Sequence, residues 1–286
     1  QRASYFSDFI NTGDNKANHA EVEKRKNAAK ESDLALLLYT SGTTGEPKGV
    51  MLPHSCILEA MRIHDIRITS VSRHDKSVCF LPLSHVFERG WTYFCFCKEI
   101  KIYLNLNPSD ILQTIKEIRP TVMCNVPRFW EKVAIGVQEK ITEMKPFQKG
   151  LVAWALAVGK NYNIDHVRIG KKSSPLLWLR YQIANIFIFN KLKKVIGIEN
   201  GNIFPTAGAA MEEQLIVFFR SLGIPIVYGY GLTETMATVS CFNYSGYKFG
   251  SVGEVMPDVK VKIGDDNEIL VKGKTVTSGY YKKPEA

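Results

Sequence analysis

The chain has 286 residues, 45% of them hydrophobic, which is enough for one large domain or two small ones with a sizeable core. Its 37 Lys and Arg against 28 Asp and Glu give a formal net charge of +9, which favours anionic partners such as nucleotides, phosphorylated cofactors, lipid or nucleic acid. No zinc-finger, recognition-helix or RRM signature accompanies this charge, so we expect no nucleic-acid partner. No apolar run approaches the roughly 18 to 20 residues that span a bilayer.

The six cysteines follow no regular framework, which indicates reduced thiols and a cytosolic setting. Cys95 and Cys97 are close in sequence, but a zinc site needs Cys-x-x-Cys or histidines in register. We therefore interpret both as small buried residues on a strand. The first residue, Gln1, and the last segment, "YYKKPEA", lead us to expect a piece of a longer protein.

The predicted elements begin after a polar segment, residues 1–33, which is typical of a solvated loop or surface helix. Residues 34–39 form a nearly continuous apolar run, which predicts a strand in a sheet covered on both faces. A Gly- and Thr-rich loop follows, and a helix begins near Pro53 or His54. Strand, loop and helix in this order are typical of an α/β fold.

The same alternation continues along the chain. The sequence predicts strands at 77–83, 100–105, 121–127, 202–208 and 225–231. It predicts helices, the first capped by Ser109 and the last ended by Gly223, at 109–119, 129–198 and 211–223. Residues 91–97 fit a helix or a strand. Apolar positions alternate in residues 259–273 around a turn, so we expect a hairpin that starts a small β-barrel.

The segment "YTSGTTGEPKG", residues 39–49, follows the apolar run "LALLL" directly. Its hydroxyls, glycines and lysine present many donors with little side-chain bulk, which close approach to a polyphosphate requires. It is not a Walker A motif, because Pro47 precedes the lysine and Gly49 follows it. We predict phosphate binding by Thr40, Ser41, Gly42, Thr43, Thr44, Gly45 and Lys48.

A second segment, "YGYGLTET" at residues 228–235, ends a predicted strand. Alternating Tyr and Gly offer an aromatic face beside bare backbone, which suits a purine ring. A hydroxyl and a carboxylate follow, and Glu234 is a hard oxygen ligand of the kind that Mg²⁺ takes beside phosphate oxygens. The predicted nucleotide-binding residues here are Tyr228, Gly229, Tyr230, Gly231 and Thr233.

Together "YTSGTTGEPKGVML" and "YGYGLTET" resemble, in order and spacing, the two nucleotide motifs of the acyl-adenylate-forming superfamily, which includes acyl-CoA synthetases, luciferases and peptide-synthetase adenylation domains. The resemblance implies that Tyr230 stacks on adenine and that Gly229 lines its pocket. It also implies that Thr233 hydrogen-bonds the α-phosphate and that Glu234 and Thr40 lie at the metal. Thr233 and Glu234 are thereby expected to be catalytic.

Two further segments fit the resemblance. In "PTAGAAM", residues 205–211, small residues let the backbone approach the purine, although relatives more often have glycine where Ala207 stands; Gly208 and Ala209 stay expected pocket residues. In "LPLSHVFERG", residues 81–90, His85 alone would be a structural histidine. The resemblance places it beside the carboxylate of the acyl substrate, where it would orient an already ionised group.

The subgroup is indicated by "SHVFERGWTY", "IKEIRPTVMCNVPRFWEKV" and "GIENGNIFPTAG", which resemble long-chain fatty acyl-CoA synthetases; residues 129–198 resemble their helical insertion. This implies ATP- and Mg²⁺-dependent conversion of a long-chain fatty acid to acyl-adenylate and then, with coenzyme A, to acyl-CoA. Two alternatives stay open: transfer to an acyl carrier protein, or an inactive homologue that senses nucleotide or lipid. Intact Thr40, Thr233 and Glu234 argue against the inactive homologue.

We therefore predict an α/β fold of mostly parallel sheets flanked by helices. Residues 1–33 are a polar lead-in, residues 34–240 the nucleotide- and acyl-binding region, and residues 241–286 an incomplete β-barrel. The family's ribose-binding aspartate, hinge and catalytic lysine would lie after Ala286, so we expect the 286-residue chain to be inactive or nearly so.

Residues 174–197, "SPLLWLRYQIANIFIFNKLKKVIG", are amphipathic and end in a basic cluster. Such a helix could lie on anionic lipid, making the protein peripheral at a membrane. A helix packed on its own domain explains the same pattern, and we favour it. Solvent exposure of the apolar face would distinguish the two.

Overall fold

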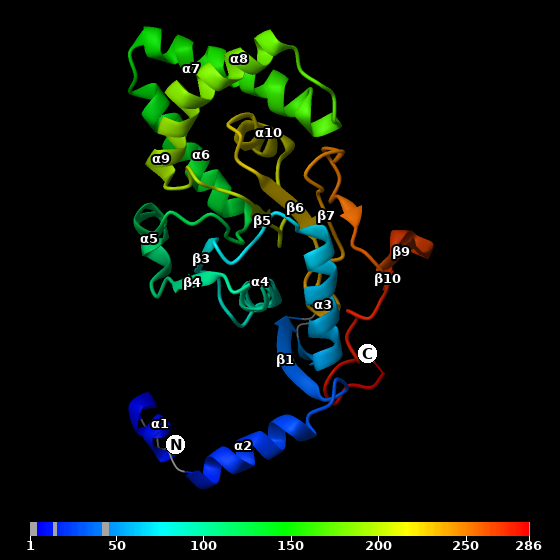
Figure 1. Ribbon diagram of the computed structural model, residues 1–286. Coiled ribbons are helices and arrows are strands. Elements are labelled where there is room, and N and C mark those ends of the chain that lie inside the picture. Colours follow the sequence, from blue (N-terminus) through cyan, green and yellow to red (C-terminus); the bar gives the residue numbers. More distant parts are fainter. Residues whose placement is uncertain (1–4, 14–15, 42–45, 286) are drawn as a thin grey trace.

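The structure, a computed structural model, describes residues 5–13, 16–41 and 46–285 (Figure 1). In chain order its main elements are α1 (Phe6–Gly13), α2 (Lys16–Ala28), β1 (Leu34–Ser41), β2 (Pro47–Pro53), α3 (His54–Arg67), β3 (Lys76–Cys79), α4 (Val86–Cys97), β4 (Lys101–Leu104), α5 (Ile111–Ile118), α6 (Pro127–Thr142), α7 (Pro146–Gly159), α8 (Pro175–Ala184), α9 (Asn190–Ile196), β5 (Phe204–Thr206), α10 (Glu213–Ser221), β6 (Ile226–Tyr230), β7 (Ser240–Cys241), β8 (Glu254–Val255), β9 (Lys260–Ile263) and β10 (Ile269–Lys272). The expected helix at His54 is confirmed.

The centre of the molecule is a mixed sheet whose first part is parallel. β3 pairs in parallel with β4, and β5 with β6. Residues 122–125 join the two pairs through parallel bridges from Val122 to Ser77 and Ile203, and from Asn125 to Thr206. β7 and β8 then extend the sheet in antiparallel order. The predicted α/β class is therefore confirmed, with the parallel strands at its centre.

Residues 127–198 are mostly helical, as the sequence predicts for 129–198. α6 begins at Pro127, where the missing amide hydrogen of proline is not needed. α7 and α8 continue into π-helical turns, residues 160–164 and 185–189, which widen the helix by one residue per turn. In Figure 1 these helices gather at one end of the molecule, whereas α1 and α2 project from the opposite end.

Two apolar cores hold the elements together. One lies around α3 and α4 and includes Val50, Ile63 and Phe94. The other lies between the helices and the sheet, around Trp130, which contacts the rings of Phe204 and Phe219. Each buried aromatic side chain of this kind contributes roughly 1.5–3 kcal/mol of hydrophobic stabilisation.

The first strand differs from its prediction. β1 pairs with β2 as an antiparallel hairpin instead of leading directly to a helix. Only Leu38 of β1 is buried, and Leu34 and Tyr39 are exposed. The expectation of a sheet covered on both faces is therefore wrong, because within the described residues β1 has one partner strand and one packed face.

Three smaller predictions also change. Ser109 does not cap a helix; the side chain of Asn107 accepts the Ser109 N–H instead. Cys95 and Cys97 lie on α4, not on a strand, and Cys97 is exposed. The hairpin of β9 and β10 is present, and in the described part of the chain these strands pair only with each other, so no barrel is closed. The proposed division into three segments stays a prediction.

Candidate functional site

The β1–β2 hairpin determines which way the side chains of the first motif point. Thr40 lies directly opposite Lys48 in the register. Residues opposite each other in an antiparallel pair point to the same face, so the hydroxyl and the ammonium share one side of the hairpin. Ser41 pairs with Pro47 through its backbone. The predicted phosphate-binding residues Gly42, Thr43, Thr44 and Gly45 lie outside the described residues.

The second motif begins within β6 (Ile226–Tyr230) and continues into a tight, strained turn. Thr233–Thr235 form a 3-10 turn, after which Met236 and Ala237 both have positive φ, 47° and 84°. Gly231 permits this fold, because a Cβ there would lie 1.1 Å from the Ala237 carbonyl oxygen. The Ala237 N–H donates to the Leu232 carbonyl, and Val239 N–H to that of Tyr230. Such strain persists only where surrounding contacts enforce it.

Tyr280 joins the two motifs. Its hydroxyl donates to Glu234 Oε1 at 2.8 Å, and its ring lies 5.0 Å from Lys48 Nζ. Burial and the neighbouring Glu234 carboxylate raise the pKa of Tyr280, so it keeps its proton and stays a donor. The backbone around it is tied to β2, since Tyr281 N–H donates to the Gly49 carbonyl and Met51 N–H to that of Gly279.

These groups line one cavity of about 850 Å³. Its polar lining comes from both motifs and from the segments around them: Thr40, Lys48, His85, Thr233, Glu234 and Tyr280. The 3-10 turn also packs against β2. Two segments far apart in the sequence therefore converge on one space, with hydroxyls, a carboxylate and an ammonium facing it.

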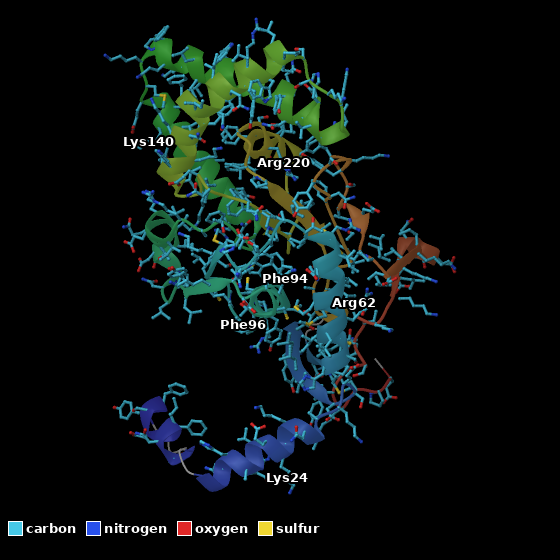
Figure 2. The ribbon with its side chains drawn as sticks, in the orientation of Figure 1. Lys24, Arg62, Phe94, Phe96, Lys140 and Arg220 are labelled. Atoms are coloured by element: carbon cyan, nitrogen blue, oxygen red, sulfur yellow. The ribbon has the colours of Figure 1, made fainter. Side chains whose placement is uncertain are left out.

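The apolar lining comes mainly from α3 and α4. Met61, Ile68, Trp91, Phe94 and Met236 face the same cavity. Phe94 lies on the side of α4 toward α3, whereas Phe96 points away from it (Figure 2). One space thus offers polar groups for an anion and an apolar wall for a hydrocarbon, which is the composition of small-molecule sites.

His64 is a partly buried polar group in this apolar wall. Its Nδ1–H donates to the Ala60 carbonyl at 2.6 Å, so its Nε2 accepts from Thr238 Oγ1 at 2.9 Å. Burial lowers the pKa of His64 below its ordinary value, which keeps the ring neutral. The histidine therefore supports the wall as a hydrogen-bonded neutral side chain.

Glu88 ties α4 to the chain before His85. Its Oε2 accepts from the N–H groups of Leu81 at 2.8 Å and Phe80 at 3.3 Å, while its Oε1 has no hydrogen-bond partner among the described residues. Burial raises the pKa of this carboxyl. The side chain fixes the loop that carries His85, whose ring is exposed to the cavity.

Some residues of the second motif and of the small-residue segment line the cavity, and others pack in the core. Gly208, Gly229, Tyr230 and Gly231 line the cavity. Tyr228 and Ala209 are not among the residues that line it; the Tyr228 hydroxyl donates to the Ala209 carbonyl, and its ring packs against Phe242. Along β6, alternation turns Val227 and Gly229 to the cavity and Tyr228 away from it, whereas Tyr230 lines the cavity from the end of the strand. The roles assigned to all these residues stay predictions.

Three cavity residues were not singled out by the sequence: Tyr280, Glu88 and His64. Tyr280 stands 46 residues after Glu234, so only the folded chain brings their side chains together. A buried acid can be suspected from Glu88 in the apolar context "HVFERGW", but its hydrogen-bond partners cannot. His64 has no sequence signal beyond its place in an apolar helix.

Curated relatives match over nearly the whole chain. Long-chain-fatty-acid–CoA ligase FadD15 of Mycobacterium bovis is 30% identical over 270 residues, which are 93% of this chain and 44% of the relative. Long-chain-fatty-acid–CoA ligase ACSBG2 of Mus musculus is 29% identical over 293 residues, 98% of this chain and 43% of the relative. The chain therefore spans less than half the length of these relatives.

Solved structures share the fold. O-succinylbenzoate CoA synthetase from Bacillus subtilis, in complex with an acyl-adenylate intermediate, superimposes with a TM-score of 0.61 at 19% identity, over 90% of this chain and 44% of that one. VinN with L-aspartate gives a TM-score of 0.61 at 20% identity, over 94% of this chain and 59% of that one. The family model for AMP-binding enzymes matches residues 3–281. The chain therefore belongs to the AMP-binding enzyme family.

Proposed function

We propose that this protein takes part in the ATP-dependent activation of a long-chain fatty acid to acyl-adenylate and then to acyl-CoA. The observation that carries the proposal is the single cavity lined by both motifs and by the apolar side chains of α3 and α4. The names of the curated relatives, long-chain-fatty-acid–CoA ligases, support the substrate class.

In the proposed reaction a carboxylate oxygen attacks the α-phosphorus of ATP. An acyl–phosphate bond forms, the bond between the α- and β-phosphates breaks, and pyrophosphate leaves. The sulfur of coenzyme A, having lost its proton to solvent, then attacks the acyl carbon; the bond between that carbon and the phosphate oxygen breaks, and AMP leaves. The residues described here would act by binding and orientation: Thr40, Lys48 and Thr233 on the phosphates, and His85 on the carboxylate. None of them is required as a nucleophile.

The residues present fit Mg²⁺ held mainly by its substrate. Within the described ranges no group of three or more His, Cys, Asp or Glu could hold a metal alone. Mg²⁺ in nucleotide sites takes one or two protein oxygens beside phosphate and water oxygens, and Glu234 and Thr40 provide such oxygens at the cavity. When bound, the ion would neutralise phosphate charge. A solved structure with this fold was obtained in complex with ATP and magnesium ion.

The test is the binding of non-hydrolysable acyl-adenylate analogues to the 286-residue protein, measured by titration calorimetry. A palmitoyl analogue should bind at least about a hundredfold more tightly than an acetyl analogue, because each buried methylene contributes roughly 0.8 kcal/mol. MgATP should compete with both. Thr233→Val should weaken the binding of both analogues similarly, since in this proposal its hydroxyl would contact the adenylate that both analogues share.

Two results would overturn parts of the proposal separately. If neither analogue binds and MgATP does not bind, the nucleotide assignment fails. If both analogues bind with equal affinity, the adenylate site stands and the long-chain substrate class fails. Thioester product analysis distinguishes coenzyme A from a carrier protein as acceptor.

A further inference from the structure

Residues 144–198 carry a charge equal to the net charge of the whole chain. They contain ten Lys and Arg, and Asp165 is their one acidic residue, giving +9, which is also the formal net charge of the 286 residues. The rest of the chain therefore sums to zero. This segment comprises α7, α8, α9 and the π-helical turns between them, at the end of the molecule farthest from α1 and α2 (Figure 1).

The helix from Pro175 through the π-helical turn 185–189 has two apolar faces. One face is packed: Ala184 and Phe189 are fully buried, and Leu177 and Tyr181 pack against the same core. The other face is exposed to solvent. Its five large apolar side chains are 42 to 61% exposed: Leu176, Leu179, Ile183, Ile186 and Phe187. Trp178, 50% exposed, lies between the two faces. The helix is therefore packed on one face, as the favoured interpretation expects, and leaves apolar side chains exposed on the other.

A second exposed apolar row lies on the neighbouring helix. α7 packs against α8 and exposes Phe147, Leu151 and Trp154, spaced by four and three residues. Intervals of three or four residues place side chains on one side of a helix. Exposed apolar side chains in such numbers mark a surface that another phase or molecule covers.

Exposed basic residues accompany the apolar face. Lys171 and Lys172 precede α8, Arg180 lies within it, and Lys191 and Lys194 follow in α9; all five are exposed. Lys193 differs, since it is buried and its Nζ donates to Asn185 Oδ1 at 3.1 Å. Aromatic and aliphatic side chains flanked by lysines are typical of helices that lie in the plane of an anionic lipid surface.

We propose that the face formed by α7, α8 and the 185–189 turn docks on the surface of a bilayer that contains anionic lipid. The positive charge would attract the headgroups, and the exposed apolar side chains would enter the boundary between headgroups and acyl chains. None of the described helices is long and apolar enough to cross a membrane, so the contact would be interfacial. Nucleic acid would also attract the basic residues. It offers no apolar environment, however, in which the exposed leucine and isoleucine side chains would be buried. This proposal does not depend on the reaction proposed above.

Flotation with sized vesicles tests the docking surface. The 286-residue protein should float with vesicles that contain roughly a third phosphatidylserine, and not with pure phosphatidylcholine vesicles. Raising the salt concentration should weaken the binding, because the charges are exposed. Lys191→Glu with Lys194→Glu should lower the partition coefficient at least about tenfold, since each basic residue near an anionic surface contributes roughly 1 kcal/mol.

A separate variant with a matched control measures how much the exposed apolar side chains contribute to vesicle binding. Trp178→Ser with Phe187→Ser should lower binding to anionic vesicles at least about tenfold, because both side chains would leave the lipid. Phe96→Ser with Leu106→Ser removes two side chains of equal or greater exposure elsewhere and should leave binding unchanged. Lys260→Glu with Lys262→Glu is the matched charge control. Urea unfolding of each variant verifies its fold.

The native tryptophans report which surface enters the lipid. Trp91 and Trp130 are buried, whereas Trp154 and Trp178 are 38% and 50% exposed. Anionic vesicles should shift the emission to shorter wavelength, and lipids brominated near the headgroup should quench it. Both changes should disappear in Trp154→Phe with Trp178→Phe.

Three results would overturn the proposal. The first is no flotation of the unmodified protein with anionic vesicles. The second is a concentration-dependent dimer, seen by light scattering, that Trp178→Ser with Phe187→Ser abolishes while vesicle binding is absent; the face would then bind a second copy. The third is equal loss of binding in the Phe96 and Leu106 control, which would show nonspecific adsorption.

Discussion

The cavity region and the helical region 144–198 use apolar side chains in opposite ways. Around the cavity, Met61, Trp91 and Phe94 point inward and are buried. On α8 and the π-helical turn after it, Trp178 and Phe187 are exposed. The charge is divided in the same way, since the helical region accounts for the whole excess of basic residues.

The difference shows that hydrophobicity alone does not identify the core of this chain. A helix with apolar side chains all round is buried on every side or exposed to an apolar phase. Here one face of α8 packs and the opposite face does not. Each of the following predictions tests a part of that contrast.

The largest expected effect separates the two faces with a single kind of substitution. Phe189→Ala should lower the free energy of unfolding by about 3–5 kcal/mol, because its buried ring leaves a cavity. Phe187→Ala, two residues earlier, should change it by less than about 0.5 kcal/mol, because its ring is exposed. Urea unfolding measures both, and equal losses would contradict the assignment of faces.

The next effect concerns the turn at the cavity. Gly231→Ala should lower the free energy of unfolding by about 2–4 kcal/mol, because the new Cβ would overlap the Ala237 carbonyl oxygen and force the backbone to move. Binding of the palmitoyl-adenylate analogue should be lost. Gly136→Ala in α6 is the control: nothing lies within 4 Å of its Cβ position, and alanine should stabilise the helix by up to about 1 kcal/mol.

A smaller effect is expected from the contact between Tyr280 and Glu234. Tyr280→Phe removes the hydroxyl and keeps the ring beside Lys48. Affinity for MgATP should fall about 2- to 10-fold, equivalent to roughly 0.5–1.5 kcal/mol for one hydrogen bond. Tyr281→Phe, at an exposed neighbouring residue, should leave it unchanged. A rise in affinity for the Tyr280 variant would show instead that its hydroxyl competes with the metal for Glu234.

The smallest effect is a pH dependence of stability. Because the folded-state pKa of His64 is lowered, the unfolded chain binds the proton more readily, and this stability is present above the unfolded pKa of about 6.5 and is lost as pH falls below it. His64→Gln should lessen the drop in unfolding free energy between about pH 7.5 and about pH 5.5. An unchanged drop in the His64 variant would assign it to other groups.

The sequence predicted the positions of helices and strands better than it predicted which strands pair with each other. The helix at His54 and the strand at 34–39 are present, but β2 was missed because its segment begins and ends with proline and contains glycine. These residues weaken a strand pattern unless the strand lies at an edge. The parallel centre of the sheet follows from the alternation of strands and helices, which is a local signal.

The candidate site was predicted where the chain itself carries a motif. Thr40, Lys48, Thr233 and Glu234 line one cavity, as two motifs binding one ligand would require. Tyr280 could not be predicted, because its contact with Glu234 depends on how residues 277–281 pack on β2. Neither could the orientation of Tyr228, since the strand predicted at 225–231 does not reveal which face of β6 meets the cavity.

The left-handed backbone at Met236 and Ala237 has a consequence for the second motif. These two residues directly follow the motif and neither favours that conformation alone, so a short synthetic peptide of residues 228–237 would relax to other shapes in water. The motif acquires its form only inside the finished tertiary structure. Grafting "YGYGLTET" onto another scaffold would therefore reproduce the sequence of the motif but not its backbone conformation.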